Sequence, residues 1–208
     1  MKLYYMSGAC SIGIHVILEE IGKPYDAIPV ALREGEQYKP EYKAITPKSK
    51  VPALMRDDGS VLTEYGTIAR WLAKSNPQAK LLPEDLETET RMSEALDYAV
   101  GTVHMQGFSR LYQPGSFTPN EADFDTVRAR GREIAANGYA LLDKALAGKD
   151  YIAGAYSIGD SALFYVGLWG GFMGVTLPAN LAAHQKRMLS RPAVQRVLKA
   201  EGLDQAKA

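Results

Sequence analysis

Residues 2–22 read KLYYMSGACSIGIHVILEEIG, and this stretch determines the kind of fold that the sequence predicts. Its first part, residues 2–6, is apolar and aromatic and stops at Ser7-Gly8, as a buried strand does. Apolar residues then recur at helical spacing from Ser11 to Ile21, and Gly22 is a typical C-terminal stop. The stretch therefore predicts a strand, a tight turn and a helix, in that order.

The residues that follow continue this alternation. Residues 25–32 predict a second strand, and Pro29 places it at a sheet edge because proline has no N–H to donate to a neighbouring strand. Two apolar runs flank Asp57-Asp58-Gly59-Ser60, which is a strong hairpin signal. A helix is predicted over residues 63–74. The first part of the chain is thus an α/β unit with a mixed sheet.

From about residue 85 the strand signals end and the sequence predicts only helices. These helices cover residues 87–111, 122–146, 157–173, 179–189 and 192–199. The third begins at Ser157-Ile158-Gly159-Asp160, which has the form of a capping box. Two prolines within residues 76–84 mark a linker. The predicted domains are therefore an α/β domain over 1–78, a linker over 79–86 and an all-helical domain over 87–208.

Composition restricts the possible partners and the cellular compartment. Lys plus Arg and Asp plus Glu balance at 24 each, so there is no basic excess to hold a phosphate backbone, and nucleic acid is not expected as a partner. No apolar run reaches the length of a membrane span, and the N-terminus is too short and polar for a signal peptide. A single cysteine, Cys10, excludes a disulfide-stapled secreted fold. We expect a cytoplasmic protein.

Cys10 and Ser11 are the first candidates for chemistry, because they lie where the first strand ends and the first helix begins. Free N–H groups and the dipole at a helix N-terminus stabilise a thiolate and lower its pKa. The same geometry lets Ser11 direct a hydroxyl and an N–H at an anion. The alternative is that Cys10 is a small buried residue and Ser11 only a helix cap.

Two further positions could bind the backbone and the charged end of a peptide. A cis-Pro52 would leave the Val51 N–H and C=O open to pair with a bound extended peptide, although a trans proline in an edge strand is the more common case. At Glu64-Tyr65, the Glu64 carboxylate could accept a ligand ammonium, while the first N–H groups of the helix could bind a ligand carboxylate. The alternative for Glu64 is a residue that only complements the helix dipole.

His104 lies inside the first long helix of the second domain. A histidine at such a position is more often a hydrogen-bonded core or interface residue than a catalyst. His15 and His184 are expected to be structural or surface residues.

These separate signals meet in one known pattern. The chain closely resembles the glutathione transferase superfamily, in particular the bacterial beta class, over essentially its whole length. The matching segments are Tyr4-Tyr5-Met6-Ser7-Gly8-Ala9-Cys10-Ser11, Val51-Pro52-Ala53-Leu54, Asp57-Asp58-Gly59, Leu62-Thr63-Glu64, Trp71-Leu72-Ala73, His104-Met105-Gln106-Gly107-Phe108, Ser157-Ile158-Gly159-Asp160 and Arg191-Pro192-Ala193-Val194. The resemblance implies an α/β thioredoxin-like N-terminal domain plus an all-α C-terminal domain, the glutathione transferase fold.

The resemblance also implies roles for individual residues. Cys10 would lie beside the glutathione sulfur and could form a mixed disulfide with it, and Ser11 could hydrogen-bond the thiolate. Val51, before a cis-Pro52, would pair with the cysteinyl backbone of glutathione. Glu64 and Tyr65 would hold the γ-glutamyl end of glutathione. His104 would approach the sulfur from the helical domain.

Several positions depart from the family pattern, and they change the charge expected around glutathione. Met105 replaces a lysine after the histidine, Asp97 replaces an asparagine, and Gly101 replaces a small hydroxyl residue. Tyr65 is bulkier than the family's residue there. The loop that includes Arg33 lacks the expected lysine, which leaves Arg33 as its substitute. Asp97, Gly101 and Arg33 are therefore included among the predicted glutathione-binding positions.

The resemblance predicts an enzyme that conjugates glutathione, as co-substrate, to a small apolar electrophile, without a metal. One alternative is a glutathione-dependent thiol-disulfide reductase with Cys10 as nucleophile. Its mixed disulfide would need an external thiol because the chain has no second cysteine. A non-catalytic carrier of glutathione conjugates is the other alternative. A homodimer is expected by resemblance.

Overall fold

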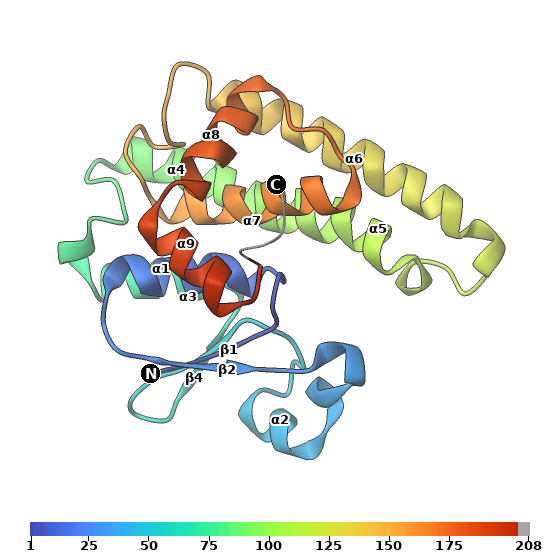
Figure 1. The fold of residues 1–208 in the computed structure, drawn as a ribbon, viewed down its shortest axis with the longest axis horizontal. Coiled ribbons are helices and arrows are strands. Elements are labelled where there is room, and N and C mark those ends of the chain that lie inside the picture. The colour runs from blue at the N-terminus through green and yellow to red at the C-terminus, as the bar shows by residue number, and fades with distance from the viewer. Residues whose placement is uncertain (204–208) are drawn as a thin grey trace. The chain divides into compact units, whose positions relative to one another are not determined.

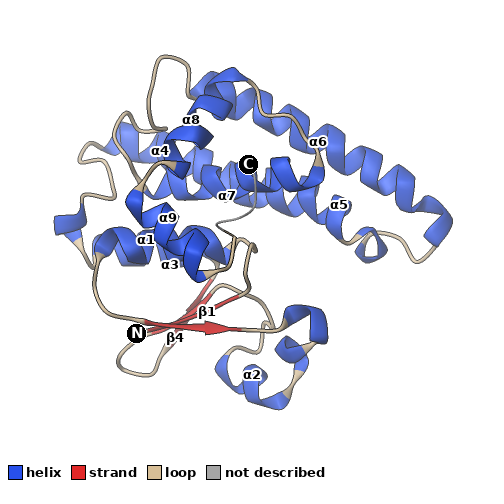
Figure 2. Ribbon diagram, in the orientation of Figure 1, coloured by secondary structure: helices blue, strands red, loops and turns tan. Residues whose placement is uncertain are grey.

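The computed structural model describes residues 1–203, and its contacts divide the chain into two compact units. The first unit consists of Met1–Leu82 together with residues 190–203, and the second of Pro83–Leu189. Figures 1 and 2 show the helices and strands of both units. The sequence assigned 192–199 to the helical domain, whereas by contacts this segment belongs to the first unit.

The first unit is built on a four-stranded sheet in the order β2-β1-β3-β4. Strand β1 (Lys2–Tyr5) pairs in parallel with β2 (Asp26–Pro29) and antiparallel with β3 (Ala53–Met55), which pairs antiparallel with β4 (Val61–Thr63). The predicted mixed sheet is confirmed. Pro29 ends the edge strand, as its missing N–H requires.

Two glycines adopt the left-handed conformation where the sequence predicted a helix end and a hairpin turn. Gly22 has φ 72° and caps α1 (Ser11–Ile21), and its N–H donates to the carbonyl of Leu18. Gly59 has φ 81° in the β3–β4 hairpin, where the Arg56 N–H donates to the Ser60 carbonyl at 2.8 Å.

Helices cover both faces of this sheet (Figure 1). Helices α1 and α3 (Tyr65–Lys74) pack together on one face. On the other face, α2 (Pro40–Ile45) contributes Tyr42 and Ile45 to an apolar cluster with Tyr4 and Ala53. The sequence did not predict α2, because a helix of six residues is too short to show a periodic pattern.

Helix α9 (Pro192–Ala200) joins the first unit because its apolar stripe packs on α1. Its residues Val194 and Val197 are fully buried. Two ion pairs border the contact, Arg196–Glu19 at 2.6 Å and Arg191–Glu20 at 2.7 Å. The predicted helix is confirmed.

The second unit begins with α4 (Leu86–Tyr98), a π-helix (Ala99–Phe108) and α5 (Ser109–Tyr112). The sequence predicted one continuous α-helix over 87–111, since side-chain periodicity cannot distinguish i→i+4 from i→i+5 backbone bonding over a few turns. The described part of the chain also contains short 3₁₀ segments at Leu32–Glu34, Glu36–Tyr38, Pro77–Ala79, Pro114–Ser116 and Glu121–Asp123.

The unit is completed by α6 (Phe124–Ala145), α7 (Ile158–Met173) and α8 (Ala179–Leu189). Helix α7 is almost wholly buried over its first three turns. Its predicted capping box is confirmed, because the Asp160 carboxylate accepts from the Ser157 N–H at 2.8 Å. None of the helices among residues 1–203 is both long and apolar enough to cross a membrane.

Small residues let the π-helix and α6 approach closely. A Cβ atom at Gly131 would lie 2.7 Å from the carbonyl oxygen of Gly107, and one at Gly138 would lie 2.5 Å from Val103 Cγ2. Neither distance leaves room for a methyl group. These two glycines of α6 are therefore required by packing, even though glycine lowers helix propensity.

We predict that Gly131→Ala destabilises the protein by about 1–3 kcal/mol, because the added methyl overpacks the backbone of the π-helix. Gly171→Ala is the matched control, since a Cβ there meets no described atom within 4 Å. Alanine's helix propensity should leave that variant neutral or more stable by up to about 1 kcal/mol. Urea unfolding of both variants checks this, and equal effects at the two positions would contradict it.

Candidate functional site

The turn between β1 and α1 positions Cys10. The Ser11 hydroxyl closes this turn, since it donates to the Met6 carbonyl and accepts from the Met6 N–H, both at 3.2 Å. Gly8 takes the left-handed conformation inside the turn, with φ 71°. Cys10 comes at the end of the turn, directly before the first residue of α1. The local structure is thus the predicted strand, turn and helix.

The Cys10 thiol is held as a hydrogen-bond donor. Its Sγ lies 3.6 Å from the carbonyl oxygen of Val51. Burial raises the pKa of this thiol to about 12, although the N–H groups of Cys10 and Ser11 and the charge of Lys50 act in the opposite direction. The sequence predicted a lowered pKa from the helix N-terminus. That prediction is wrong, because burial outweighs the helix-end groups.

Ser11 is fully buried, and its hydroxyl is engaged with Met6. The Ser11 side chain does not cap α1, as the alternative interpretation expected, but closes the turn before the helix. Its backbone N–H is the group that bears on the Cys10 sulfur. A hydroxyl contact with a glutathione thiolate, as the resemblance implied, would require Ser11 to leave Met6.

Val51 and Pro52 lie beside Cys10, and the peptide bond between them is cis. The segment before them is held in place because the Tyr42 hydroxyl donates to the Lys50 carbonyl at 2.8 Å. The structure thus brings Cys10 and Val51 together as the sequence expected, with the Val51 carbonyl occupied by the thiol.

Glu64 precedes α3 in a strained conformation, with φ 68° and ψ 125°. A non-glycine residue in this region costs on the order of 1–3 kcal/mol and is most often kept at functional sites. Lys48 Nζ lies 2.6 Å from its carboxylate, and both side chains are mostly exposed. Tyr65, by contrast, is buried, so the group it presents at the start of α3 is its backbone N–H.

Sequence reasoning missed the two lysines that the structure places at this site. Lys48 pairs with Glu64, and the charge of Lys50 acts on Cys10. Both lysines lie within the three residues before Val51-Pro52, and this position is the sequence feature that could have revealed them. Arg33, the predicted substitute for the family lysine, is exposed in the 3₁₀ segment Leu32–Glu34.

The remaining predicted residues lie in the second unit. Asp97 is exposed on α4, and Gly101 and His104 lie in the π-helix. His104 Nδ1 is 3.3 Å from the Tyr165 hydroxyl, and its ring contacts that of Trp169 edge-on at 4.6 Å between centroids. A π-helix is frequently found at functional positions. His104 therefore belongs to a half-buried aromatic cluster.

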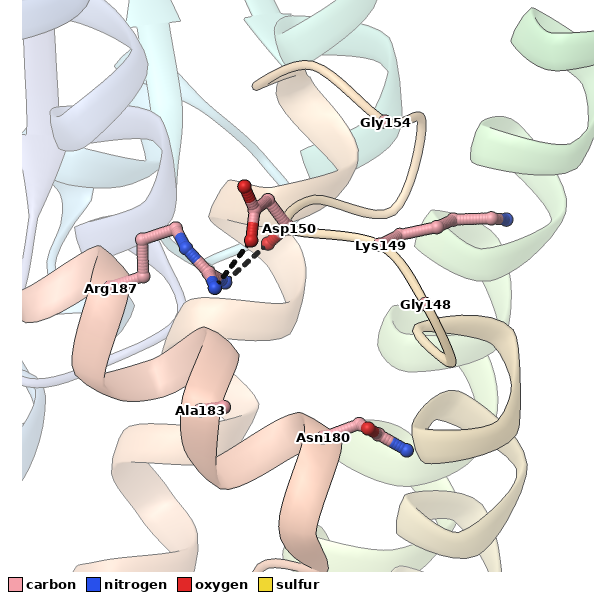
Figure 3. Close-up of a pocket in the computed structure, with 7 residues that line it drawn as sticks. All are labelled: Gly148, Lys149, Asp150, Gly154, Asn180, Ala183 and Arg187. Atoms are coloured by element: carbon pink, nitrogen blue, oxygen red, sulfur yellow. Dashed lines mark hydrogen bonds and ion pairs between the residues drawn. The ribbon is translucent and has the colours of Figure 1, made fainter.

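The second unit also contains an open hollow of about 570 Å³, drawn in Figure 3. It lies between α8 and the loop after α6, and Arg187 reaches across it to Asp150 at 2.6 Å. The other residues around it are Gly148, Lys149, Gly154, Asn180 and Ala183. None of the predicted site residues lines this hollow.

Comparisons with known proteins agree with this arrangement. Residues 8–75 match the family model described as glutathione S-transferase, N-terminal domain. The glutathione S-transferase GstA of Escherichia coli O157:H7 is 36% identical over 208 residues, which cover 98% of this chain and 100% of that protein. The chain belongs to the glutathione transferase family.

Two solved structures support the fold of this glutathione transferase. A bacterial beta class enzyme from Sphingomonas chungbukensis is 33% identical, with a TM-score of 0.85 over 98% of this chain and 100% of that chain. A sphingomonad glutathione S-transferase complexed with glutathione is 34% identical, with a TM-score of 0.84 over the same shares. The predicted thioredoxin-like unit followed by helices is confirmed.

Among residues 1–203 of this transferase, no group of three or more His, Cys, Asp or Glu side chains is placed to hold a metal ion. The Cys10 thiol, whose pKa burial raises, gives a direct test of the geometry.

We predict that iodoacetamide alkylates Cys10 slowly. At about pH 8 the rate should be roughly 50-fold below that of a free cysteine, because a pKa near 12 leaves little thiolate and higher nucleophilicity recovers only part of the loss. Cys10 is the sole cysteine, so mass spectrometry of the intact protein follows the reaction without ambiguity. Urea-unfolded protein is the control, and equal rates in the two states would contradict the prediction.

Proposed function

We propose that this protein binds glutathione on its first unit and transfers the glutathione thiolate to small apolar electrophiles. The family membership supports this, as does the similar sphingomonad enzyme that was solved in complex with glutathione. The residues of the first unit fit such a ligand by their chemistry. An exposed carboxylate, an open helix N-terminus and a backbone edge beside a cysteine suit a peptide with an ammonium, carboxylates and a thiol.

In this proposal Glu64 receives the ammonium of the γ-glutamyl group, and the N–H of Tyr65 receives its carboxylate. Lys48 covers Glu64 in the absence of ligand. Because both side chains of this pair are mostly exposed, the pair contributes little and a ligand ammonium can displace it. The Val51 backbone pairs with the cysteinyl residue, and Arg33 offers a charge for a second carboxylate.

The observation that carries the choice of reaction is the state of Cys10. A thiol that donates to the Val51 carbonyl and has a raised pKa stays protonated near neutral pH, so it is a poor nucleophile. A reductase would need Cys10 to attack a disulfide as a thiolate. The nucleophile that remains is the sulfur of glutathione itself.

The proposed reaction is a substitution or an addition. The glutathione thiol loses its proton to solvent, and its thiolate sulfur forms a C–S bond with the electrophilic carbon. In a substitution the C–halogen bond breaks and the halide leaves with the electron pair. In an addition the π bond of the C=C group breaks, and the adjacent carbon takes a proton from solvent. N–H groups at the helix end, such as those of Cys10 and Ser11, favour an anionic sulfur and lower the pKa of the bound thiol.

The helical unit would select the electrophile. The half-buried rings of His104 and Trp169, which pack on the buried ring of Tyr165, offer an apolar surface suited to an aromatic substrate. The roles of Asp97, Gly101 and His104 at glutathione stay predictions, as do the cytoplasmic location and the homodimer. Size-exclusion chromatography with light scattering would test the last of these.

We predict that Cys10→Ala retains glutathione-dependent turnover of chlorodinitrobenzene to within about tenfold of wild type, because Cys10 is not the nucleophile. Disulfide exchange should be weak in both proteins. Exchange that disappears in Cys10→Ala, with no conjugation in wild type, would instead show a reductase. Glutathione-conjugate binding without turnover of any electrophile would show a carrier.

We predict that Glu64→Gln raises the KM for glutathione about 10- to 100-fold with little change in kcat, because it removes a charge-assisted contact that ground state and transition state share. Lys48→Met is the matched control. It removes the same ion pair but keeps the carboxylate, so its KM should stay within about threefold of wild type. Parallel changes in the two variants would contradict the assigned role of Glu64.

A further inference from the structure

The end of α9 reaches the turn that carries Cys10, and the proposed function does not yet use this contact. Glu201 follows α9 directly, and its side chain is completely buried. One carboxylate oxygen accepts from the Gly8 N–H at 2.9 Å, and the other lies 2.8 Å from His15 Nδ1. The backbone carbonyl of Glu201 accepts from the Ser7 hydroxyl at 2.6 Å.

A buried carboxylate needs such partners, because leaving it unpaired costs several kcal/mol. Those partners belong to the turn and to α1, so the position of Glu201 and the position of the turn are linked. Two further bonds define the turn from its other side, from the Ser11 hydroxyl to the Met6 carbonyl and from the Met6 N–H to the Ser11 hydroxyl. Residues 7 and 8 are therefore held between Ser11 and Glu201.

The carboxylate itself is firmly placed. The Glu201 N–H donates to the Val197 carbonyl at 2.8 Å, and the Leu203 N–H donates to the Leu198 carbonyl at 2.7 Å. Leu203 also packs on Gly8, since a Cβ there would lie 3.8 Å from its Cδ1. The ion pairs of α9 with Glu19 and Glu20 hold the helix on α1.

Other titratable groups surround His15, the partner of Glu201. The rings of Tyr5 and Tyr25 lie 5.3 Å and 5.7 Å from the His15 ring. Burial and the charge of Glu201 raise the pKa of Tyr5, and Glu19 accepts from the Tyr25 hydroxyl at 2.7 Å. The carboxylates of Glu201 and Glu19 are thus two negative charges next to this cluster, and of these Glu201 contacts His15 directly.

We infer that Glu201 is a positioning residue for the sulfur end of the site, which acts through the Gly8 N–H and the Ser7 hydroxyl to set the turn that presents Cys10 and the first N–H groups of α1. For turnover, this inference rests on the proposed function. For the geometry of Cys10 it does not, because the reactivity of the thiol can be measured without glutathione.

The decisive variant is Glu201→Gln, which keeps the size of the side chain and removes its charge. Its matched control is Glu20→Gln, which breaks the Arg191 pair on the same α1–α9 contact without touching the turn. Both variants are first compared by urea unfolding, and reactivities are then corrected for the unfolded fraction. Ser7→Ala is a milder second variant, since Ser7 is exposed and its loss should not prevent folding.

In ligand-free protein, a displaced turn would enclose the Cys10 sulfur less completely. The alkylation rate of Cys10 should therefore rise in Glu201→Gln by roughly threefold for each unit that the thiol pKa falls, and not in Glu20→Gln. Ser7→Ala should change it in the same direction by less. With glutathione, kcat/KM should fall about tenfold in Glu201→Gln, because misplaced N–H groups stabilise the glutathione thiolate less well. For the same reason, the pH at which kcat reaches half its maximum, which follows the pKa of the bound thiol, should move upward.

Each outcome decides the inference. An alkylation rate and a pH profile in Glu201→Gln that match those of Glu20→Gln would overturn it and leave Glu201 a residue of stability only. If Glu201→Gln does not fold, an unchanged Cys10 rate in Ser7→Ala overturns it, and a raised rate supports it. If wild type shows no turnover with glutathione, the proposed function fails, while the alkylation rates still decide the role of Glu201.

Discussion

The hydrogen bonds between Ser11 and Met6 are the interaction on which the first unit's chemistry depends. They close the turn between β1 and α1, and so determine where Cys10 and the first N–H groups of α1 lie. The Ser11 hydroxyl thereby gives both the N–H and the carbonyl of Met6 a hydrogen-bond partner within the fold. Cys10 follows directly from this turn, and its thiol donates to the Val51 carbonyl at the ends of the two central strands, β1 and β3.

The second unit depends in a similar way on a buried carboxylate. Asp160 accepts from the N–H groups of Ser157 and Ile152, and His184 Nε2 lies 2.9 Å from its Oδ1. One side chain thus caps α7, fixes the loop before it and pairs with α8. Both units use a single carboxylate to join segments distant in sequence, since a buried charge is tolerated only where several donors meet it.

Burial also determines what kind of chemistry Cys10 can support. The same helix end that would stabilise a thiolate is present, yet enclosure of the sulfur outweighs it and keeps the thiol protonated. A protonated cysteine beside a backbone edge is suited to lie near another sulfur without reacting with it.

Local patterns were sufficient for most of the fold and for part of the site. Helix α1 and its stop at Gly22, the edge position of Pro29, the capping box at Asp160 and the bounds of α8 follow from neighbours a few residues apart. The candidate positions Cys10, Val51 and Glu64 came from local patterns at element ends, and His104, inside a helix, came from its match to a family motif. The short helix α2 and the π-helix carry no distinct periodicity, so the sequence did not reveal them.

What only the tertiary structure decided concerns groups far apart in the chain. The sequence by itself determined the order of elements and the residue types at the ends of β1 and α3. It could not determine that Glu201 would reach Gly8, that Lys48 would pair with Glu64, or that the Cys10 thiol would be buried against Val51. Hydrogen bonding and desolvation depend on distance in space, and a pKa responds to both, so these properties exist only once the chain has folded.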